Sequence, residues 1–139
     1  MSDFDPTDPG SYNFWATEHV RFADLDMLGH VNNKAYATYF ETGRVAFMTE
    51  CGLSDGLRVG VAMVRLEIDY RKEIRFPATL RLGVRLLRLG NSSLTLACAI
   101  FNGDVCAATS QSTAVRFDAE ARGSKPFSPS ERQALESYL

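Results

Sequence analysis

Residues 22–36 read Phe-Ala-Asp-Leu-Asp-Met-Leu-Gly-His-Val-Asn-Asn-Lys-Ala-Tyr, the densest run of reactive side chains in the sequence. The run holds two carboxylates, one histidine and two asparagines: Asp24, Asp26, His30, Asn32 and Asn33. The asparagines are good N-cap residues and apolar residues follow them at helical spacing, so a strand-to-helix junction is predicted here. A carboxylate at such a junction faces unpaired backbone N–H groups and the positive end of the helix dipole. This pairs a base or nucleophile with donors for an oxyanion, as acyl transfer requires, and makes the run the candidate active site.

The composition is that of an ordinary soluble globular domain. The chain has 139 residues, 45% apolar and 23% charged, which fits one domain with a real core. A net charge of -2 and a pI of about 5.7 argue against nucleic acid as a partner. No apolar run approaches the roughly 18 residues of a membrane span. The acidic start with Pro6 and Pro9 is unlike a signal peptide, so a cytoplasmic location without membrane partners is expected.

Cysteine and histidine usage predicts no cofactor and no metal site. Cys51, Cys98 and Cys106 are an odd set without a Cys-x-x-Cys pair, which disfavours a disulfide framework or a zinc knuckle. Cys98 lies in an apolar alternation and is expected to be a buried small side chain. Only His19 accompanies His30, and no ligand cluster surrounds either residue. No phosphate-cradling glycine motif is present.

The order of expected elements indicates an α+β fold. Residues 1–12 read as a flexible lead-in and residues 13–139 as one domain. Residues 14–23 favour a strand and residues 33–50 a long buried helix that ends at Gly52. Alternating apolar residues between 59 and 117 predict four antiparallel strands, with a type I′ hairpin turn at Asn102-Gly103.

Three further features refine this expectation. Gly43 in mid-helix suggests a close backbone approach. Ser128-Pro129-Ser130-Glu131 is a capping box that opens a short C-terminal helix. One helix cannot cover a five-stranded antiparallel sheet, so edges and the outer face remain unprotected and oligomerisation is expected.

The pattern Val20-Arg-Phe-x-Asp-x-Asp-x-x-Gly-His-Val-Asn-Asn-x-x-Tyr36, followed by Tyr-Phe-Glu-x-x-Arg44, resembles the hotdog-fold acyl-CoA thioesterases. The 4-hydroxybenzoyl-CoA thioesterase family is the branch it resembles most, and the similarity runs from about residue 14 to residue 118. The resemblance implies a five-stranded antiparallel sheet wrapped around the helix at 33–50. It also implies two protomers sharing one continuous sheet, with dimers pairing into homotetramers and the active site at the dimer interface.

The resemblance assigns roles to residues at the junction. The catalytic carboxylate maps onto Asp26, and the oxyanion donors map onto the backbone amides around Asn33. His30 is either catalytic or a structural residue that bonds the loop, and both interpretations stay open. Asp24 either forms an acid/base pair with Asp26 or, as we favour, fixes the loop or pairs with Arg21.

Other positions are expected to bind substrate or to pair structurally. Tyr36 is expected to line the acyl pocket. A cluster at the end of one strand and the following turn is expected to contact CoA, the alternative being a solvated hairpin: Arg88, Asn91, Ser92 and Ser93. Glu41 on the helix is either a second catalytic acid or, as we favour, a structural partner of Arg44 or Arg65.

The sequence therefore predicts a homo-oligomeric acyl-CoA thioesterase that needs no cofactor and releases a free acid and CoA. Asp26 would act as general base or nucleophile. Two alternatives remain: an acyl-ACP thioesterase, whose partner would be an acyl carrier protein, and a non-catalytic acyl-binding hotdog module.

Overall fold

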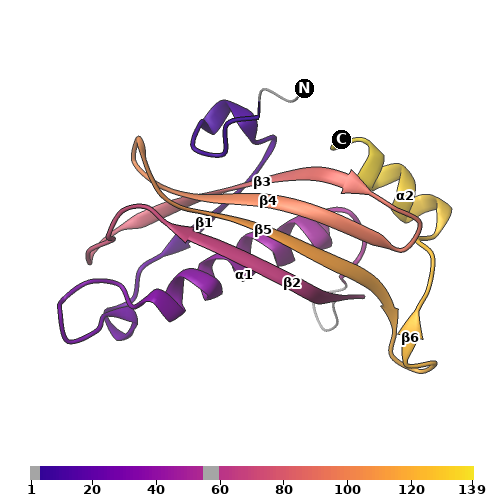
Figure 1. The fold of residues 1–139 in the computed structure, drawn as a ribbon, viewed down its shortest axis with the longest axis horizontal. Helices are drawn as coiled ribbons and strands as arrows, with labels where there is room; N and C mark the ends of the chain where they lie inside the picture. Colours follow the sequence, from indigo (N-terminus) through magenta and orange to yellow (C-terminus); the bar gives the residue numbers. More distant parts are fainter. Residues whose placement is uncertain (1–3, 55–59) are drawn as a thin grey trace.

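The computed structural model describes residues 4–54 and 60–139. Five long strands form one antiparallel sheet in the order β1-β3-β4-β5-β2 (Figure 1). Their bounds are β1 Phe14–His19, β2 Val61–Tyr70, β3 Thr79–Leu89, β4 Ser93–Asn102 and β5 Val105–Asp118. A two-residue strand that the sequence did not indicate, β6 Gly123–Ser124, pairs with the end of β5. The α+β expectation is confirmed.

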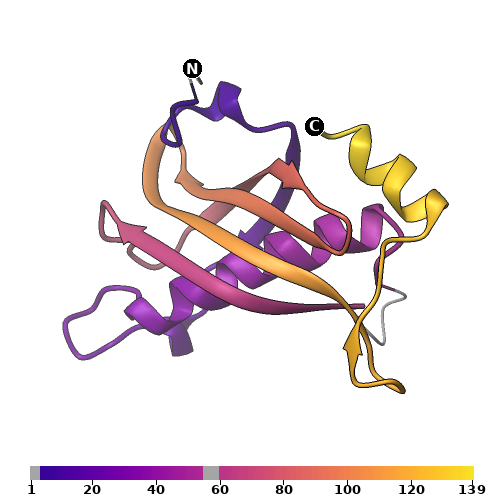
Figure 2. The same cartoon turned by 45° about the vertical axis from the view of Figure 1, so that its right-hand side comes forward.

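The long helix α1, Asn33–Glu50, has the predicted bounds. The Asn32 side chain caps its N-terminus, and Gly52 at φ +80° follows its C-terminus, as expected for a left-handed cap. The sheet curls around α1, which packs mainly against β1, β3 and β4 (Figure 2). This is the predicted hotdog arrangement.

Gly43 marks where α1 comes close to the sheet. A Cβ at this position would lie 3.4 Å from Leu82 Cβ and 3.5 Å from a methyl carbon of Val84, both on β3. These are ordinary van der Waals distances to side chains, so an alanine methyl would fit here and the predicted close backbone approach is not required.

Two local predictions needed correction. The first strand ends at His19 rather than residue 23, because a 3-10 turn, η2 Phe22–Asp24, follows it. The β4–β5 hairpin turns at Gly103 and Asp104, with positive φ only at Gly103. That is the type II′ pattern rather than the predicted type I′.

The termini pack on the sheet. The short helix α2, Pro129–Glu136, begins with the predicted capping box of Ser128 and Glu131. Within the expected lead-in, residues 9–11 form the 3-10 turn η1, and Tyr12 is buried against Phe101 on the outer face of the sheet.

The edge strand β2 is the most exposed part of the sheet. Val64 is 63% exposed and Met63 46%, although both are apolar. No helix in the described ranges is long and apolar enough to cross a membrane.

Candidate active site

The loop before α1 is a small closed hairpin that holds Asp26. The Asp26 N–H donates to the His30 carbonyl at 2.9 Å, and the Gly29 N–H donates to the Asp26 carbonyl at 3.1 Å. Gly29 adopts φ +81°, which favours glycine. The Val31 N–H donates to the Ile74 carbonyl at 2.9 Å, so the loop is tied to the β2–β3 connection. The backbone of Asp26 is therefore fixed from both sides.

The Asp26 side chain is oriented within this hairpin. Its Oδ1 accepts a hydrogen bond of 2.9 Å from the Leu28 N–H. Asp26 does not cap the helix, because Asn32 does so: Asn32 Oδ1 accepts from the Lys34 N–H at 3.0 Å. The carboxylate is half-buried and is held beside the helix N-terminus without serving as its cap.

Asn33 is the first residue of α1. Its backbone N–H donates to no acceptor in the described parts of the chain, as expected for a first-turn amide. An unpaired amide at the positive end of an 18-residue helix is well placed to stabilise negative charge.

A pocket of about 390 Å³ brings the predicted residues together. Four of them line it: Asp26, His30, Asn33 and Tyr36. The remaining lining residues come from the loop and from the end of β2 and the connection after it: Val31, Tyr70, Arg71, Lys72 and Glu73. The pocket thus joins a carboxylate, an imidazole and a helix N-terminus.

Two tyrosines form one wall of the pocket. Tyr36 donates to the Lys72 carbonyl at 3.0 Å and packs edge-on against Tyr70, with ring centroids 5.1 Å apart. Tyr70 in turn donates to the Asn33 carbonyl at 3.3 Å. Burial raises the pKa of Tyr36, so its hydroxyl stays protonated at neutral pH.

His30 is held by an acid that the sequence did not single out. Its Nε2 lies 2.7 Å from Glu73 Oε2, and Glu73 Oε1 pairs with Arg75 at 3.1 Å. The imidazole therefore lines the pocket in a fixed orientation. Glu73 and Tyr70 escaped the sequence analysis because their contacts with residues 30–36 join positions about 40 apart, and no local motif marks them.

Asp24 fixes the loop, as predicted. Its Oδ2 accepts from the Tyr39 hydroxyl at 2.6 Å and from the Arg21 N–H at 2.9 Å, while the Arg21 guanidinium lies 3.6 Å from Oδ1. Burial alone would raise the pKa of Asp24, but these hydrogen bonds outweigh it and hold the pKa below its ordinary value. Asp24 is therefore an ionised structural carboxylate.

The expected pairing of Glu41 with Arg44 or Arg65 is wrong for a single copy of the chain. Arg65 pairs with Glu67 at 2.7 Å. Arg44 is only 9% exposed, and its Nη1 has no partner among the described residues. Arg44 turns toward the sheet near Cys98, whose pKa burial raises to about 12, so Cys98 is a neutral buried thiol as expected.

The expected CoA-contacting cluster lies away from this pocket. Arg88 is near the end of β3, Asn91 and Ser92 form the β3–β4 turn and Ser93 begins β4. The turn lies one strand length of about 35 Å from the Thr79 end of β3. The turn is braced by the C-terminal part of the chain, since the Ser92 carbonyl accepts from the Arg116 N–H at 2.7 Å. Within one copy, the cluster and Asp26 are not brought together.

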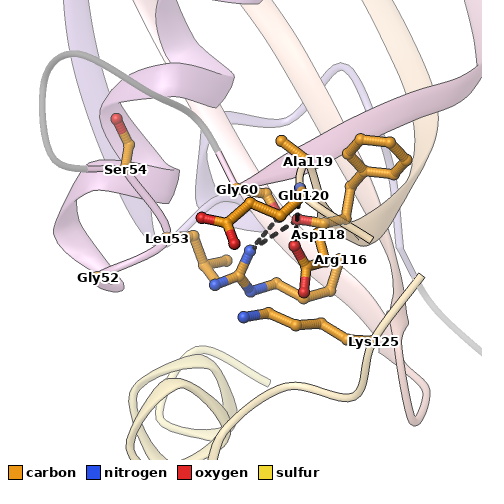
Figure 3. A pocket seen from close by; sticks show the side chains of 10 residues that line it. Gly52, Leu53, Ser54, Gly60, Arg116, Asp118, Ala119, Glu120 and Lys125 are labelled. Carbon is orange, nitrogen blue, oxygen red and sulfur yellow. Dashed lines mark hydrogen bonds between the residues drawn. The ribbon is translucent and has the colours of Figure 1, made fainter. Parts of the chain in front are cut away.

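A second pocket of about 320 Å³ lies near that turn (Figure 3). Two of its charged side chains are already paired, the first being Arg116, which donates to the Gly60 carbonyl at 2.6 Å and to Glu131 at 3.0 Å. Asp118 accepts from two backbone N–H groups of the turn that follows it, at 3.0 and 3.2 Å. This pocket offers no histidine and no helix N-terminus, so the Asp26 pocket is the better candidate for chemistry.

Comparisons with known proteins point to one protein family. A family model described as the Thioesterase-like superfamily matches residues 20–135. The uncharacterized protein YsmA of Bacillus subtilis (strain 168) is 31% identical over 87 residues, which is 62% of this chain and 59% of that protein's length. The match thus spans less than two thirds of that relative.

Solved structures match over most of the chain. A predicted thioesterase from Bacillus stearothermophilus has a TM-score of 0.83 at 26% identity, covering 91% of this chain and 96% of its own. A thioesterase from Thermus thermophilus, solved with coenzyme A and Zn, has a TM-score of 0.80 at 27% identity, covering 89% of this chain and 98% of its own.

Proposed function

The chain belongs to the thioesterase-like superfamily, and from that membership we propose that it hydrolyses an acyl-CoA thioester to a free acid and CoA. The observation that carries the proposal is that the Asp26 carboxylate and the start of α1 line the same pocket. Thioester hydrolysis needs a group that activates or delivers the nucleophile and donors that stabilise the resulting oxyanion. Both needs are met within one short segment, from Asp26 in the loop to the first turn of the helix.

Asp26 is proposed to act as general base or as nucleophile. As a base, it takes a proton from water while the water oxygen adds to the thioester carbonyl carbon. The tetrahedral intermediate then collapses, the C–S bond breaks and the CoA thiolate leaves. As a nucleophile, the carboxylate itself adds to the carbonyl, expels the thiolate and leaves an anhydride that water hydrolyses.

The Asn33 amide is proposed to stabilise the oxyanion in either route. An unpaired N–H at a helix N-terminus supplies a donor together with about half an elementary charge from the dipole. Removing one such donor from an acyl-transfer enzyme typically lowers kcat by about 10²–10³. Asn33 would act through its backbone, so its side chain is a secondary contributor.

His30 is proposed to orient the attacking water. Its bond to Glu73 fixes the imidazole at the pocket wall, where it can hold a water molecule beside Asp26. In this role His30 contacts the reacting water, whereas Glu73 is a positioning residue that acts through His30.

Coenzyme A is the proposed carrier for two reasons: cationic side chains line the pocket, and the similar thioesterase from Thermus thermophilus was solved with CoA. Arg71 and Lys72 are exposed cations in the pocket lining, where they suit the phosphates of CoA. Tyr36 and Tyr70 supply an apolar wall for the pantetheine arm or the acyl group.

We further propose that the working unit is at least a dimer. The edge strand β2 ends beside the pocket at Tyr70, and its exposed apolar residues would be buried by a second copy. A two-fold arrangement along β2 reverses the sheet direction in the second copy. The Arg88–Ser93 region of one copy would then lie toward the Asp26 end of the other, where CoA contact becomes feasible.

The test is thiol release from short, long and aromatic acyl-CoAs by the wild type and by Asp26→Asn. We expect kcat to fall by about 10²–10⁴ in the variant. Its fold should persist, because Asn Oδ1 can still accept from the Leu28 N–H. Asp104→Asn is the matched control, since the same change there alters an exposed carboxylate of the β4–β5 turn outside the pocket.

Two outcomes would contradict the proposal. Unchanged turnover in Asp26→Asn would exclude this carboxylate from the chemistry. A wild type inert on every acyl-CoA would exclude the CoA carrier, and the same panel on acyl-ACP would then separate a carrier-protein thioesterase from an acyl-binding module.

A further inference from the structure

Four exposed apolar side chains gather at one end of the molecule, beside the catalytic pocket. Met27 is fully exposed, Leu28 is 80% exposed and Phe22 75%, all in the loop before α1. Phe76, in the β2–β3 connection, is 44% exposed, and its ring packs edge-on against Phe22 with ring centroids 5.9 Å apart. We call these four residues the apolar tip. An exposed apolar patch rimmed by polar residues marks an interaction site.

The backbone that carries the apolar tip is fixed by hydrogen bonds. The closed hairpin before α1 projects Met27 and Leu28 from its apex, and the Val31 N–H ties this loop to the Ile74 carbonyl of the β2–β3 connection at 2.9 Å. Both segments lie at the same end of the fold, where the loop before α1 extends past the sheet (Figures 1 and 2). None of the four side chains belongs to β2, so a dimer that pairs along that strand does not by itself account for them.

Exposed cations surround the apolar tip. Four of them lie in the same two segments and at the start of α1: Arg21, Lys34, Lys72 and Arg75. Lys34 and Lys72 form no ion pair within the described ranges. The acids at this end are covered or engaged, because the Asp24 side chain is only 12% exposed and Glu73 already pairs with His30. The exposed charge here is therefore mostly positive, although the whole chain carries a net charge of -2.

We propose that the apolar tip docks on an anionic lipid surface and that the pocket takes a long-chain acyl-CoA from that surface, the second part resting on the proposed function. Protruding apolar side chains enter the acyl region of a bilayer while flanking cations stay among anionic headgroups. A lipid surface yields to a protrusion, whereas a folded partner needs a matching hollow and about 800 Å² of contact on each side. Lack of a spanning apolar run predicts no membrane partner, but a surface contact needs no such run.

Docking of the tip has a consequence for the substrate. Asp26 directly precedes Met27 in the chain and lines the catalytic pocket together with Lys72, so insertion of the tip places the pocket mouth at the lipid surface. A long-chain acyl-CoA joins an apolar chain to anionic phosphates, and such an amphiphile collects at the same kind of surface. Long-chain acyl-CoA held at a membrane is therefore the substrate class that this end of the molecule fits.

Co-sedimentation with lipid vesicles tests the docking. Wild type should bind vesicles of phosphatidylcholine and phosphatidylserine, and should bind them less as the salt concentration rises. Met27→Ser/Leu28→Ser should lower the partition coefficient at least about tenfold, because two apolar side chains no longer leave water. Lys34→Gln should lower it about fivefold on these vesicles and leave binding to pure phosphatidylcholine unchanged.

A matched control separates the tip from general stickiness. Leu139→Ser makes the same change as Leu28→Ser at a residue that is 55% exposed at the C-terminus, on the other side of the molecule (Figure 1), and should leave the partition coefficient unchanged. Met27 and Leu28 are exposed, so their double variant should keep the wild-type melting temperature.

Three results would overturn the lipid proposal. The first is a wild type that binds neither kind of vesicle, and the second is equal binding by wild type and Met27→Ser/Leu28→Ser. The third is binding to an acidic acyl carrier protein that the double variant loses, without any binding to vesicles, which would assign the tip to a protein partner.

Thioester turnover separates the docking from the proposed function. With a long-chain acyl-CoA held in anionic vesicles, Met27→Ser/Leu28→Ser should raise KM about tenfold, whereas Met27→Ser should match wild type on a short soluble acyl-CoA. Vesicle binding that the double variant loses would support the docking even in a protein that hydrolyses no acyl-CoA, a result that refutes the function. Hydrolysis by a wild type that never binds vesicles would refute the docking and leave the function standing.

Discussion

Replacing Tyr39 by Phe tests how the candidate active-site loop is held. Tyr39 is fully buried on α1, and its hydroxyl donates to Asp24 Oδ2 at 2.6 Å. The same carboxylate oxygen accepts from the Arg21 N–H, so the bond joins the helix to the turn that precedes the Asp26 hairpin. Phenylalanine fills the same space and deletes only this bond.

The expected loss is that of a hydrogen bond to a charged group. Such bonds contribute about 1.5–3 kcal/mol to the free energy of unfolding. For a domain of this length, that loss lowers Tm by roughly 5 to 10 °C. The Asp24 side chain is shielded, with 12% of it exposed, so water replaces the missing donor poorly and the upper half of the range is expected.

The loss of stability in Tyr39→Phe should depend on pH in a definite direction. Because the pKa of Asp24 is depressed in the folded protein, its contribution is complete above the unfolded pKa of about 3.9. The contribution is lost as the pH falls through the lower folded pKa. Without the Tyr39 hydroxyl the folded pKa rises, so wild type and Tyr39→Phe should differ most at pH 7 and progressively less below about pH 4.

Thermal unfolding of both proteins between pH 7 and pH 3 measures the effect. Tyr70→Phe is the matched control, since its exposed hydroxyl makes a longer bond of 3.3 Å to a neutral carbonyl and should cost little. An unchanged Tm in Tyr39→Phe, or a deficit of the same size at pH 7 and pH 3, would refute the account of Asp24 as an ionised anchor.

Two further predictions concern the pocket. Gly29→Ala should cost about 1–2 kcal/mol and lower kcat, because alanine resists the φ of +81° that closes the Asp26 hairpin. Gly29→Asn should show a smaller loss of stability and of kcat. If Gly29→Ala and Gly29→Asn lose the same amount in thermal melts and in steady-state kinetics, the backbone conformation is not the cause. Glu73→Gln should lower kcat less than about tenfold, because it loosens His30 while the Asp26 carboxylate remains. A collapse as large as that of Asp26→Asn in the same assay would place Glu73 in the chemistry itself.

The sequence predicted those parts of the site that local interactions determine. Asn32 caps the helix through a bond to Lys34, two residues on, and Gly52 ends it through its own backbone conformation. Both signals are contained in a few consecutive residues, which explains why the bounds of α1 were right. The end of β1 was wrong because Asp24 folds the chain into a turn there, with help from Tyr39 fifteen residues away.

The missed residues follow from the same reasoning. Tyr70 and Glu73 enter the pocket only because the end of β2 and the connection after it lie beside the start of α1. That proximity depends on the pairing of β2 with β5 at the far edge of the sheet, which no motif within residues 22–36 encodes. The candidate carboxylate and the amide were predictable, whereas the side chains that complete the wall were not.

Glu41 and Arg44 show how a wrong local prediction can carry information. Their spacing of three residues favours an ion pair on one helix, worth a few tenths of a kcal/mol when both side chains are solvated. Arg44 instead turns toward the sheet and loses its solvent, so a weak surface pair cannot compensate for its burial. A charge in that position needs an acceptor other than Glu41, such as a buried water. The local pairing therefore fails because of burial, which a spacing of three residues does not encode.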